Sequence, residues 1–503
     1  MSFEPVFETV TLSGKKCEVS DRVKAECRTD VSNENVVKII NVSAYSVIKE
    51  SEVNGDKIKF TGKTNFYVCY EDEGGSPAKY ECATEFSGEL KADCISEDSF
   101  IKIRCVTEKA EADTSGIKLN LSARVAVYAT VENEEKFDFI NGGENVVADV
   151  KRATFKKRVA KVKSVYPVEE EFEIPFVIQD VLSHRAEVTV NSVQCGVGSL
   201  IVDGEVLLSA ILLQNGDKKD IIKEQRALPF RAELDCDTAM PVCDAVAEVS
   251  VKSFKTDISV DEEKAKSYVS ASITVNIDGE VFDDEEMSVC DDVFSITEEV
   301  KTERATLSLP KEIGQKTFVV PVRGKADVDA VAEGGECVAA FNERAEIVSY
   351  TLTENGINVL GTLAATVLCK TAEGRTVSSK AETSFETLLD YPVGNNASVR
   401  LCATANNAKC QLVNAAEAEI SADVVITVYS ESFEQVGYVK NATSCGEKKT
   451  CDSAISVYIP MEGETLWSLS KRLNVAPEQL TETNKELQFP LTGKERIVVY
   501  RQK

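Results

Sequence analysis

Residues 58–68, 200–210 and 357–367 read IKFTGKTNFYV, LIVDGEVLLSA and INVLGTLAATV. In each stretch apolar residues alternate with polar ones, a glycine interrupts the pattern, and the alternation then resumes. A period of two is what a β-strand needs to bury one face and expose the other. The three stretches therefore predict the same strand three times, with the glycine marking a bulge or a close backbone approach.

Two further landmarks follow each glycine in the same order. The glycines are Gly62, Gly204 and Gly361, the next landmarks are Phe86, Phe230 and Phe385, and the last are Ser-Ala pairs beginning at Ser122, Ser270 and Ser421. Turn-forming sequences such as Asn54-Gly55-Asp56 separate the strand-like runs. Three ordered landmarks that recur three times predict three copies of an all-β unit of about 150 residues. We place these units at residues 1–150, 151–305 and 306–450.

The sequence changes character in residues 455–503. The expected elements are a strand at 456–460, a helix capped by Thr465 with inward residues to 473, a second helix from Pro477 to about 483, and a strand at 496–500. The order strand, helix, helix, strand predicts a small βααβ domain. The expected fold class is therefore multidomain and mainly β, with three repeated all-β domains followed by a βααβ domain.

Charge separates the tail from the rest of the chain. The 503 residues include 84 acidic and 57 basic residues, for a net charge of -27. Residues 456–503 contain six Glu, no Asp and seven Lys and Arg, so the tail carries +1 and the first 455 residues carry -28. An acidic chain is repelled by phosphate backbones and anionic lipids, which predicts no nucleic-acid binding. The contrast predicts that the tail is a separate module with its own partner.

Targeting signals are not apparent in the sequence. Residues 1–5 lack the basic and apolar segments of a signal peptide. The longest apolar stretch, residues 206–213, is far shorter than the roughly 20 residues that a membrane-spanning helix needs. We therefore expect a cytoplasmic protein without membrane insertion.

The tail resembles the LysM family. Residues 462–470 read EGETLWSLS, close to the family's P-G-D-T-L-W-x-[IL]-[AS], and Asn474-Val475, Asn484 and Gly493 stand where the family's later motifs fall. The chain departs from the pattern at Glu462, where the family has Pro, and at Glu464, where it has Asp. The resemblance covers the whole tail.

The LysM resemblance implies a ligand groove between two loops. Its residues would be Gly463, Glu464, Thr465, Leu466 and Trp467 on one wall, and Lys485, Leu487 and Leu491 on the other. Many LysM domains bind N-acetylglucosamine polymers such as peptidoglycan there. Trp467, the only Trp of the chain, has two interpretations, as a packing residue or as a surface contact.

The complete arrangement is similar to the SipL-type spore morphogenetic proteins of Clostridia, which carry three SPOCS domains and a terminal LysM domain. That resemblance implies a non-catalytic adaptor of the endospore coat. It would act in the mother cell, bind the coat-basement ATPase SpoIVA through its LysM domain, and localise coat proteins at the forespore surface. Binding of peptidoglycan or cortex glycan by the tail is the alternative.

No pattern in the sequence favours catalysis. The one histidine, His184, is expected in a solvated loop without a surrounding motif, and no phosphate-binding or nucleophile-elbow motif occurs. The sixteen cysteines are scattered without any C-x-x-C pair. We interpret them as reduced, buried small hydrophobes and expect neither a metal site nor a cofactor. Late oxidation or cross-linking in an assembled coat is the other interpretation of the cysteines.

Overall fold

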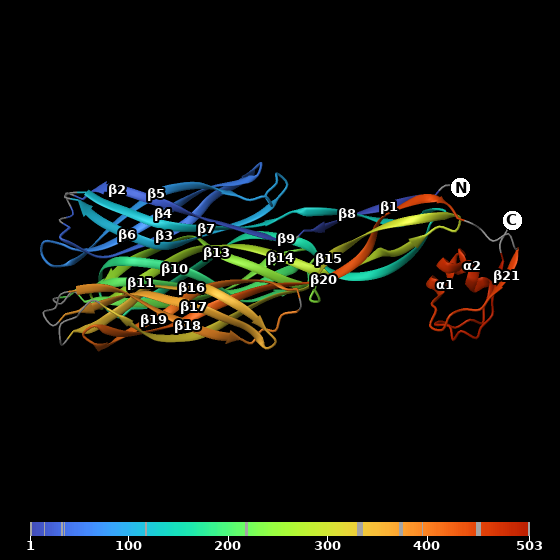
Figure 1. The fold of residues 1–503 in the computed structure, drawn as a ribbon. Helices are drawn as coiled ribbons and strands as arrows, with labels where there is room; N and C mark the ends of the chain where they lie inside the picture. The colour runs from blue at the N-terminus through green and yellow to red at the C-terminus, as the bar shows by residue number, and fades with distance from the viewer. Residues whose placement is uncertain are drawn as a thin grey trace.

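The computed structural model describes residues 3–14, 16–31, 34, 36–115, 118–216, 220–328, 335–371, 376–394, 396–448 and 454–500. Within them the fold is mainly β, as the sequence predicts: the described elements are strands apart from two short helices in the tail. Figure 1 shows an elongated molecule with a head of several sheets, a narrower stalk and the small tail beside the far end of the stalk.

Three consecutive segments build the same arrangement of strands. The first comprises β1 (Glu4–Ser13), β2 (Cys17–Asp30), β3 (Lys38–Asn54), β4 (Lys57–Glu71), β5 (Pro77–Lys91), β6 (Phe100–Ser115), β7 (Lys118–Glu132) and β8 (Glu134–Glu144). The second comprises β9 (Val147–Ile174), β10 (Ile178–Cys195), β11 (Ser199–Gln214), β12 (Ile221–Asp235), β13 (Asp244–Asp261) and β14 (Lys266–Phe294). The third comprises β15 (Glu298–Asp327), β16 (Glu336–Thr353), β17 (Gly356–Lys370), β18 (Thr376–Leu389), β19 (Ser398–Asn414) and β20 (Glu417–Glu447).

Each segment forms two three-stranded antiparallel sheets. The inner sheets have the orders β3-β4-β5, β10-β11-β12 and β16-β17-β18, and the outer sheets have the orders β2-β7-β6, β9-β14-β13 and β15-β20-β19. Alternate residues of the facing strands build one apolar core between the two sheets of each segment. In β7, for example, Leu119, Leu121, Ala123 and Val125 are all buried. The unit is therefore a six-stranded β-sandwich that occurs three times.

The landmark glycines and phenylalanines are cross-strand partners. Phe86 pairs with Gly62, Phe230 with Gly204 and Phe385 with Gly361. A Cβ on Gly62 would lie only 2.2 Å from Cζ of the Phe86 ring. In all three repeats the strand on the other side of the glycine has a bulge at the same place. This confirms the prediction that the glycine marks a bulge and a close approach, since the ring lies directly over it.

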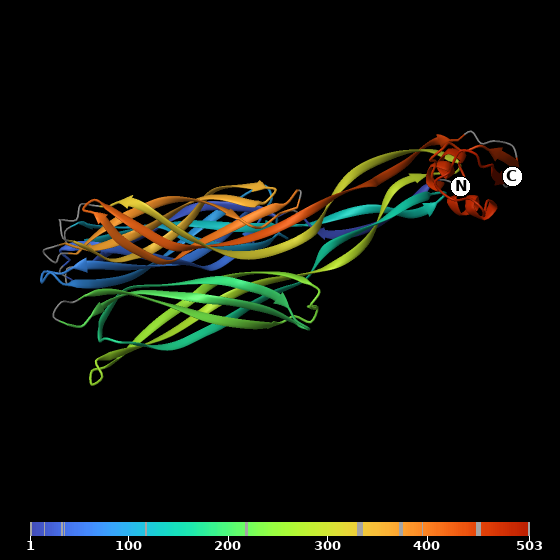
Figure 2. The same ribbon diagram turned by 90° about the horizontal axis from the view of Figure 1, so that it is seen from below.

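The three sandwiches close into a ring. Strand β5 of the first repeat contacts β10 of the second, β12 of the second contacts β16 of the third, and β18 of the third contacts β3 of the first. Cys69, Ile211 and Leu368 follow their landmark glycines by the same number of residues and lie in one buried cluster. The repeats therefore pack around a common axis with pseudo-threefold symmetry, and Figure 2 shows them side by side.

The stalk is made from the ends of the same strands. Strand β1 pairs with β8, the first half of β9 pairs with the second half of β14, and the first half of β15 pairs with the second half of β20. The three ribbons share one core whose members come from every repeat: Leu12, Phe139, Phe155, Met287, Val289, Leu307, Leu309 and Tyr438. Phe139, Met287 and Tyr438 are the same number of residues apart as the three Ser-Ala landmarks. The pseudo-threefold symmetry thus continues along the stalk.

The chain passes from one repeat to the next at the tip of the stalk. The crossings lie at residues 145–146 and 295–297. The boundaries expected at residues 150 and 305 fall inside β9 and β15, a few residues beyond these crossings, because the landmarks lie in the head and do not mark the stalk. The expected end of the third repeat, residue 450, lies outside the described residues.

The tail contains β21 (Ile455–Tyr458), α1 (Leu466–Leu473), α2 (Pro477–Thr483) and β22 (Ile497–Tyr500). The two strands pair antiparallel, and the helices pack on one face of this small sheet around Leu469, Leu480 and Ile497. The order βααβ is the one that the sequence predicts. Among the described residues, neither helix is long and apolar enough to cross a membrane.

Candidate functional site

Local interactions fix the shape of the tail. Thr465 caps α1: its Oγ1 accepts from the backbone N–H of Ser468, and the Ser468 side chain accepts from the N–H of Thr465. Asn484 joins the end of α2 to β22, because its amide accepts from the N–H of Val498 and donates to the carbonyl of the same residue, each over 2.8 Å. The two loops of the expected groove are therefore held by a rigid frame.

The two expected groove walls lie side by side. The N–H of Gly463 donates to the carbonyl of Leu491 over 2.8 Å, and the N–H of Leu491 donates to the carbonyl of Glu464 over 3.0 Å. Gly463 has φ +80°, in the left-handed region that glycine adopts readily. These bonds bring the first wall and the end of the second together as one continuous piece of backbone.

Glu464 has a structural role in that arrangement. Its carboxylate forms a bidentate pair with Arg472, with distances of 2.7 Å to Nε and 2.9 Å to Nη2, and also accepts from the N–H of Met461. The hydrogen bond from Arg472 is the main reason that the pKa of Glu464 lies below its ordinary value. The side chain is buried, so Glu464 is engaged inside the tail.

The remaining predicted groove residues divide into two groups. Leu466 and Leu487 pack against the tail core, and Leu491 is one of its buried members. Gly463, Thr465 and Lys485 are exposed. The structure thus brings the eight predicted residues into one region, but only these three are fully open to solvent.

Trp467 contacts the tip of the stalk. Its indole Nε1 donates to Oδ2 of Asp292 over 2.9 Å, and its ring meets that of Phe294 edge-on with centroids 5.1 Å apart. Phe294 and Asp292 lie at the end of β14. Of the two interpretations of Trp467, neither packing in the tail core nor contact with an external ligand describes this position.

Other residues of the α1 region extend the same contact. Lys471 lies one turn after Trp467 and donates to both carboxylate oxygens of Asp292, at 2.9 and 2.6 Å. Lys448, just after β20, donates to Oδ1 of Asn474 over 2.7 Å and to the carbonyl of Ser295 over 2.8 Å. Residues 467, 471 and 474 share one side of the helix, so α1 is docked on the stalk by that side.

Asp292 is the centre of this docking contact. Burial is the largest influence on its carboxyl group and opposes ionisation, but the hydrogen bonds from Lys471 and Trp467 outweigh burial and lower its pKa. Arg304 adds a further positive charge at 3.8 Å. The ionised carboxylate of Asp292 therefore accepts strong hydrogen bonds from Lys471 and Trp467.

An exposed apolar face on the tail was missed by the motif comparison. Ile455, Val457, Ile459, Met461 and Tyr500 are each more than half exposed. Ile455 and Val457 lie in β21, and Ile459 and Met461 continue the same sequence spacing just after it. Ile455 pairs with Tyr500 and Val457 with Val498, so these side chains share the outer face of the β21–β22 sheet. The period-two pattern in residues 455–461 could have revealed this surface.

His184 lies in strand β10 and is partly buried, which makes the expectation of a solvated loop wrong. Its Nδ1 is 2.7 Å from the hydroxyl of Thr256, and its Nε2 is 3.1 Å from the hydroxyl of Tyr67 of the first repeat. Burial lowers its pKa. Ser183, His184 and Arg185 form a polar run inside β10, and each has a hydrogen-bond partner in another repeat, so the polar run does not mark a loop.

Cys17 and Cys94 form a disulfide in the first repeat, which corrects the interpretation that every cysteine is reduced. The other thirteen described cysteines are free, and most are partly or fully buried. Among the described residues, no group of three His, Cys, Asp or Glu side chains is arranged to hold a metal ion.

No protein-family model, curated protein or solved structure matches this chain. The class that fold and geometry define is therefore a structural one: a pseudo-threefold ring of β-sandwiches with a three-ribbon stalk and a docked βααβ module.

Proposed function

We propose that this protein is a non-catalytic adaptor of endospore coat assembly. Its tail would bind the coat-basement ATPase SpoIVA at the forespore surface, and its three β repeats would recruit coat proteins. One observation carries the proposal: the tail and the head lie at opposite ends of the stalk (Figure 1). Two separate surfaces joined by a rigid spacer suit a protein that connects two partners.

The chemistry of the tail favours a protein partner over a glycan. Sugar sites combine aromatic platforms with free polar groups, but Trp467 and Glu464 are both engaged within the molecule. The tail instead exposes aliphatic side chains of β21 and of the residues just after it, with Val457 60% and Ile459 71% exposed. Aliphatic surface of this kind is stabilised by apolar protein surface, and exposed apolar patches mark interaction sites.

The same reasoning gives the place of action. A tail that recognises a coat-basement protein would act in the cytoplasm of the mother cell and gather at the forespore surface. The near-neutral tail and the acidic remainder suit two different partners. Neither role needs a catalytic residue or a cofactor.

Co-purification with a SpoIVA homologue tests the proposal. A chain lacking residues 456–503 should lose the partner. In the full chain, Val457→Glu should weaken binding at least tenfold, whereas Thr481→Glu, which adds the same charge to the exposed side of α2, should not. Titration of the full chain with chitin oligomers addresses the alternative. Binding of the oligomers together with unchanged SpoIVA binding by Val457→Glu would overturn the proposal.

A further inference from the structure

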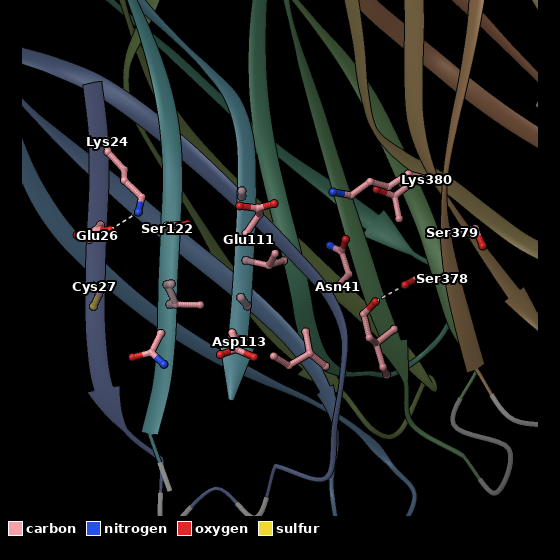
Figure 3. Close-up of a pocket in the computed structure, with 18 of the residues that line it drawn as sticks. Lys24, Glu26, Cys27, Asn41, Glu111, Asp113, Ser122, Ser378, Ser379 and Lys380 are labelled. Atoms are coloured by element: carbon pink, nitrogen blue, oxygen red, sulfur yellow. Dashed lines mark hydrogen bonds and ion pairs between the residues drawn. The ribbon is translucent and has the colours of Figure 1, made fainter. Parts of the chain in front are cut away.

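The head contains one large cleft, at the seam where the ring closes between the first and third repeats. Its volume is about 1230 Å³. Figure 3 shows its two walls: Glu111 and Asp113 of β6 stand on one side, and Ser378, Ser379 and Lys380 of β18 stand on the other. The cleft lies far from the tail, so its role is independent of the tail's partner.

The pseudo-threefold symmetry gives this cleft two counterparts. Lys79, Lys223 and Ser378 pair with Cys69, Ile211 and Leu368, the three equivalent members of the buried cluster at the axis. The three residues therefore occupy the same position in β5, β12 and β18. Each faces the seam to the next repeat in the ring.

Lysine side chains cross the other two seams at this position. Lys79 of the first repeat reaches Asp180 of the second over 3.1 Å. Lys223 of the second repeat reaches three groups of the third: the carbonyl of Ala340 at 2.6 Å, the carbonyl of Ala408 at 3.1 Å and the carboxylate of Glu343 at 3.1 Å. A buried ammonium group joins the repeats there.

At the third seam the short side chain of Ser378 also reaches the first repeat, where its hydroxyl donates to the carbonyl of Ile40 in β3. The serine side chain is shorter than that of lysine and carries no charge, and this difference accounts for the space that is open here. The cleft thus lies at the seam where Ser378 stands in place of the lysine that the other two seams have.

Two of the three groups that accept the Lys223 ammonium have counterparts at this seam. Val42 in the first repeat is equivalent to Ala340 in the third. Val42 pairs with Val68 and Ala340 pairs with Val367, and these two partners follow their landmark glycines by the same number of residues. Ala110 and Ala408 also hold equivalent positions. Each directly precedes the residue that pairs with a landmark serine, which is Ser122 in the first repeat and Ser421 in the third. Both Val42 and Ala110 line the cleft.

The charge of the walls is mixed, with one more acidic than basic residue. Four acidic residues, Glu26, Glu111, Asp113 and Asp327, line the cleft with three basic ones, Lys24, Arg28 and Lys380. Lys24 already pairs with Glu26, and Lys109 pairs with Glu111. Lys380, on the opposite wall, holds the position of Gln225 in the second repeat and not that of Lys223. It therefore does not replace the missing lysine at the seam.

We propose that the cleft binds a lysine side chain presented by a partner protein. The inserted ammonium would take the place that Lys223 fills in the next seam, between the carbonyls of Val42 and Ala110 and the carboxylate of Glu111. A partner that supplied it would close the ring at its open seam. The head would thereby recognise a basic, lysine-bearing surface.

Thermal unfolding of the full chain tests the proposal with Nα-acetyl-lysine N-methylamide as the probe. At tenfold over its dissociation constant the probe should raise the Tm by roughly 1–2 °C. The same compound acetylated at Nε has no charge and should leave the Tm unchanged. Equal shifts with both compounds would overturn the proposal.

Two Ser→Lys variants on one strand supply a matched comparison. Ser378→Lys should fill the cleft from within, raise the Tm by about 1–2 °C and abolish the response to the probe. Ser384→Lys adds the same charge to an exposed position of β18 and should respond like the unaltered protein. A Ser378→Lys variant that still responds fully to the probe would exclude the cleft as the binding site.

Discussion

The indole N–H of Trp467 donates to the carboxylate of Asp292 across 2.9 Å, between residues that lie 175 positions apart in the sequence. This bond, with the edge-on contact to Phe294, fixes the tail to the tip of the stalk. The tail is therefore presented in one orientation, with the outer face of β21 and β22 exposed.

Loss of the Asp292 carboxylate should release the tail. Hydrogen bonds to charged groups contribute about 1.5–3 kcal/mol, so Asp292→Ala should increase the undocked population tenfold or more. Because Trp467 is the only Trp, its fluorescence reports this contact directly and should shift to longer wavelength. Asp291→Ala, which removes a neighbouring carboxylate paired with Lys151, should leave the emission unchanged. An equal shift in both variants would contradict the assignment.

The docking contact should resist acid down to the ordinary pKa of an aspartate and fail below it. The folded-state pKa of Asp292 is lowered from 3.8, so the contact is fully present above that value and is lost as the pH falls through the lowered pKa. Trp467 emission should be constant from pH 7 to about 4 and change only at lower pH. Asp292→Asn should show no such step. A midpoint near pH 5 or above would refute this account.

Lys223 should be essential to the junction of the second and third repeats. Its side chain and that of Glu343 are only 10% and 4% exposed, and removal of one member of a buried pair costs about 3–5 kcal/mol. We expect Lys223→Met to lower the free energy of unfolding by that amount in denaturant titrations.

Two comparisons separate this effect from a general loss of charge. Lys223→Met combined with Glu343→Met should cost less than Lys223→Met alone, because no unpaired carboxylate stays buried. Lys325→Met breaks the exposed pair with Glu417 and should change stability by about 0.5 kcal/mol or less. Equal losses in the Lys223 and Lys325 variants would show that burial has no part in the effect.

The Gly62–Phe86 pair should behave as one unit. A Cβ at position 62 would meet three ring atoms of Phe86 within 2.7 Å, so Gly62→Ala should cost about 1–3 kcal/mol. In a Phe86→Ala background the same change should be neutral or stabilising, since alanine is favoured over glycine in a strand by about 0.5–1 kcal/mol. Gly437→Ala is the control, because its Cβ would meet nothing within 4 Å. Additive effects at positions 62 and 86 would contradict the pairing.

Local patterns in the sequence predict the three repeats and the βααβ tail. Gly62 and Phe86 have their equivalents in each repeat because the glycine and the phenylalanine pack on each other within one sandwich. The closure of the ring was not predictable in that way, since contacts such as that between Lys223 and Ala340 depend on how whole sandwiches pack.

The candidate site shows the same difference between local contacts and contacts of distant segments. The capping role of Thr465 could be read from neighbouring residues. The partner of Trp467 could not, because nothing near Asp292 in the sequence distinguishes it from the other acidic residues of the chain. The contact of His184 with Tyr67 and the pairing of Cys17 with Cys94 likewise depend on segments far away along the chain.

The path of β20 has a mechanical consequence. The strand runs from the head to the stalk tip, and the tail follows it, while β15 pairs with it antiparallel along its whole length. A pull on the tail against an anchored head acts along β20, across hydrogen bonds that lie perpendicular to the strand. The load is therefore shared by many backbone bonds at once in shear, which makes the stalk suited to holding two surfaces together under tension.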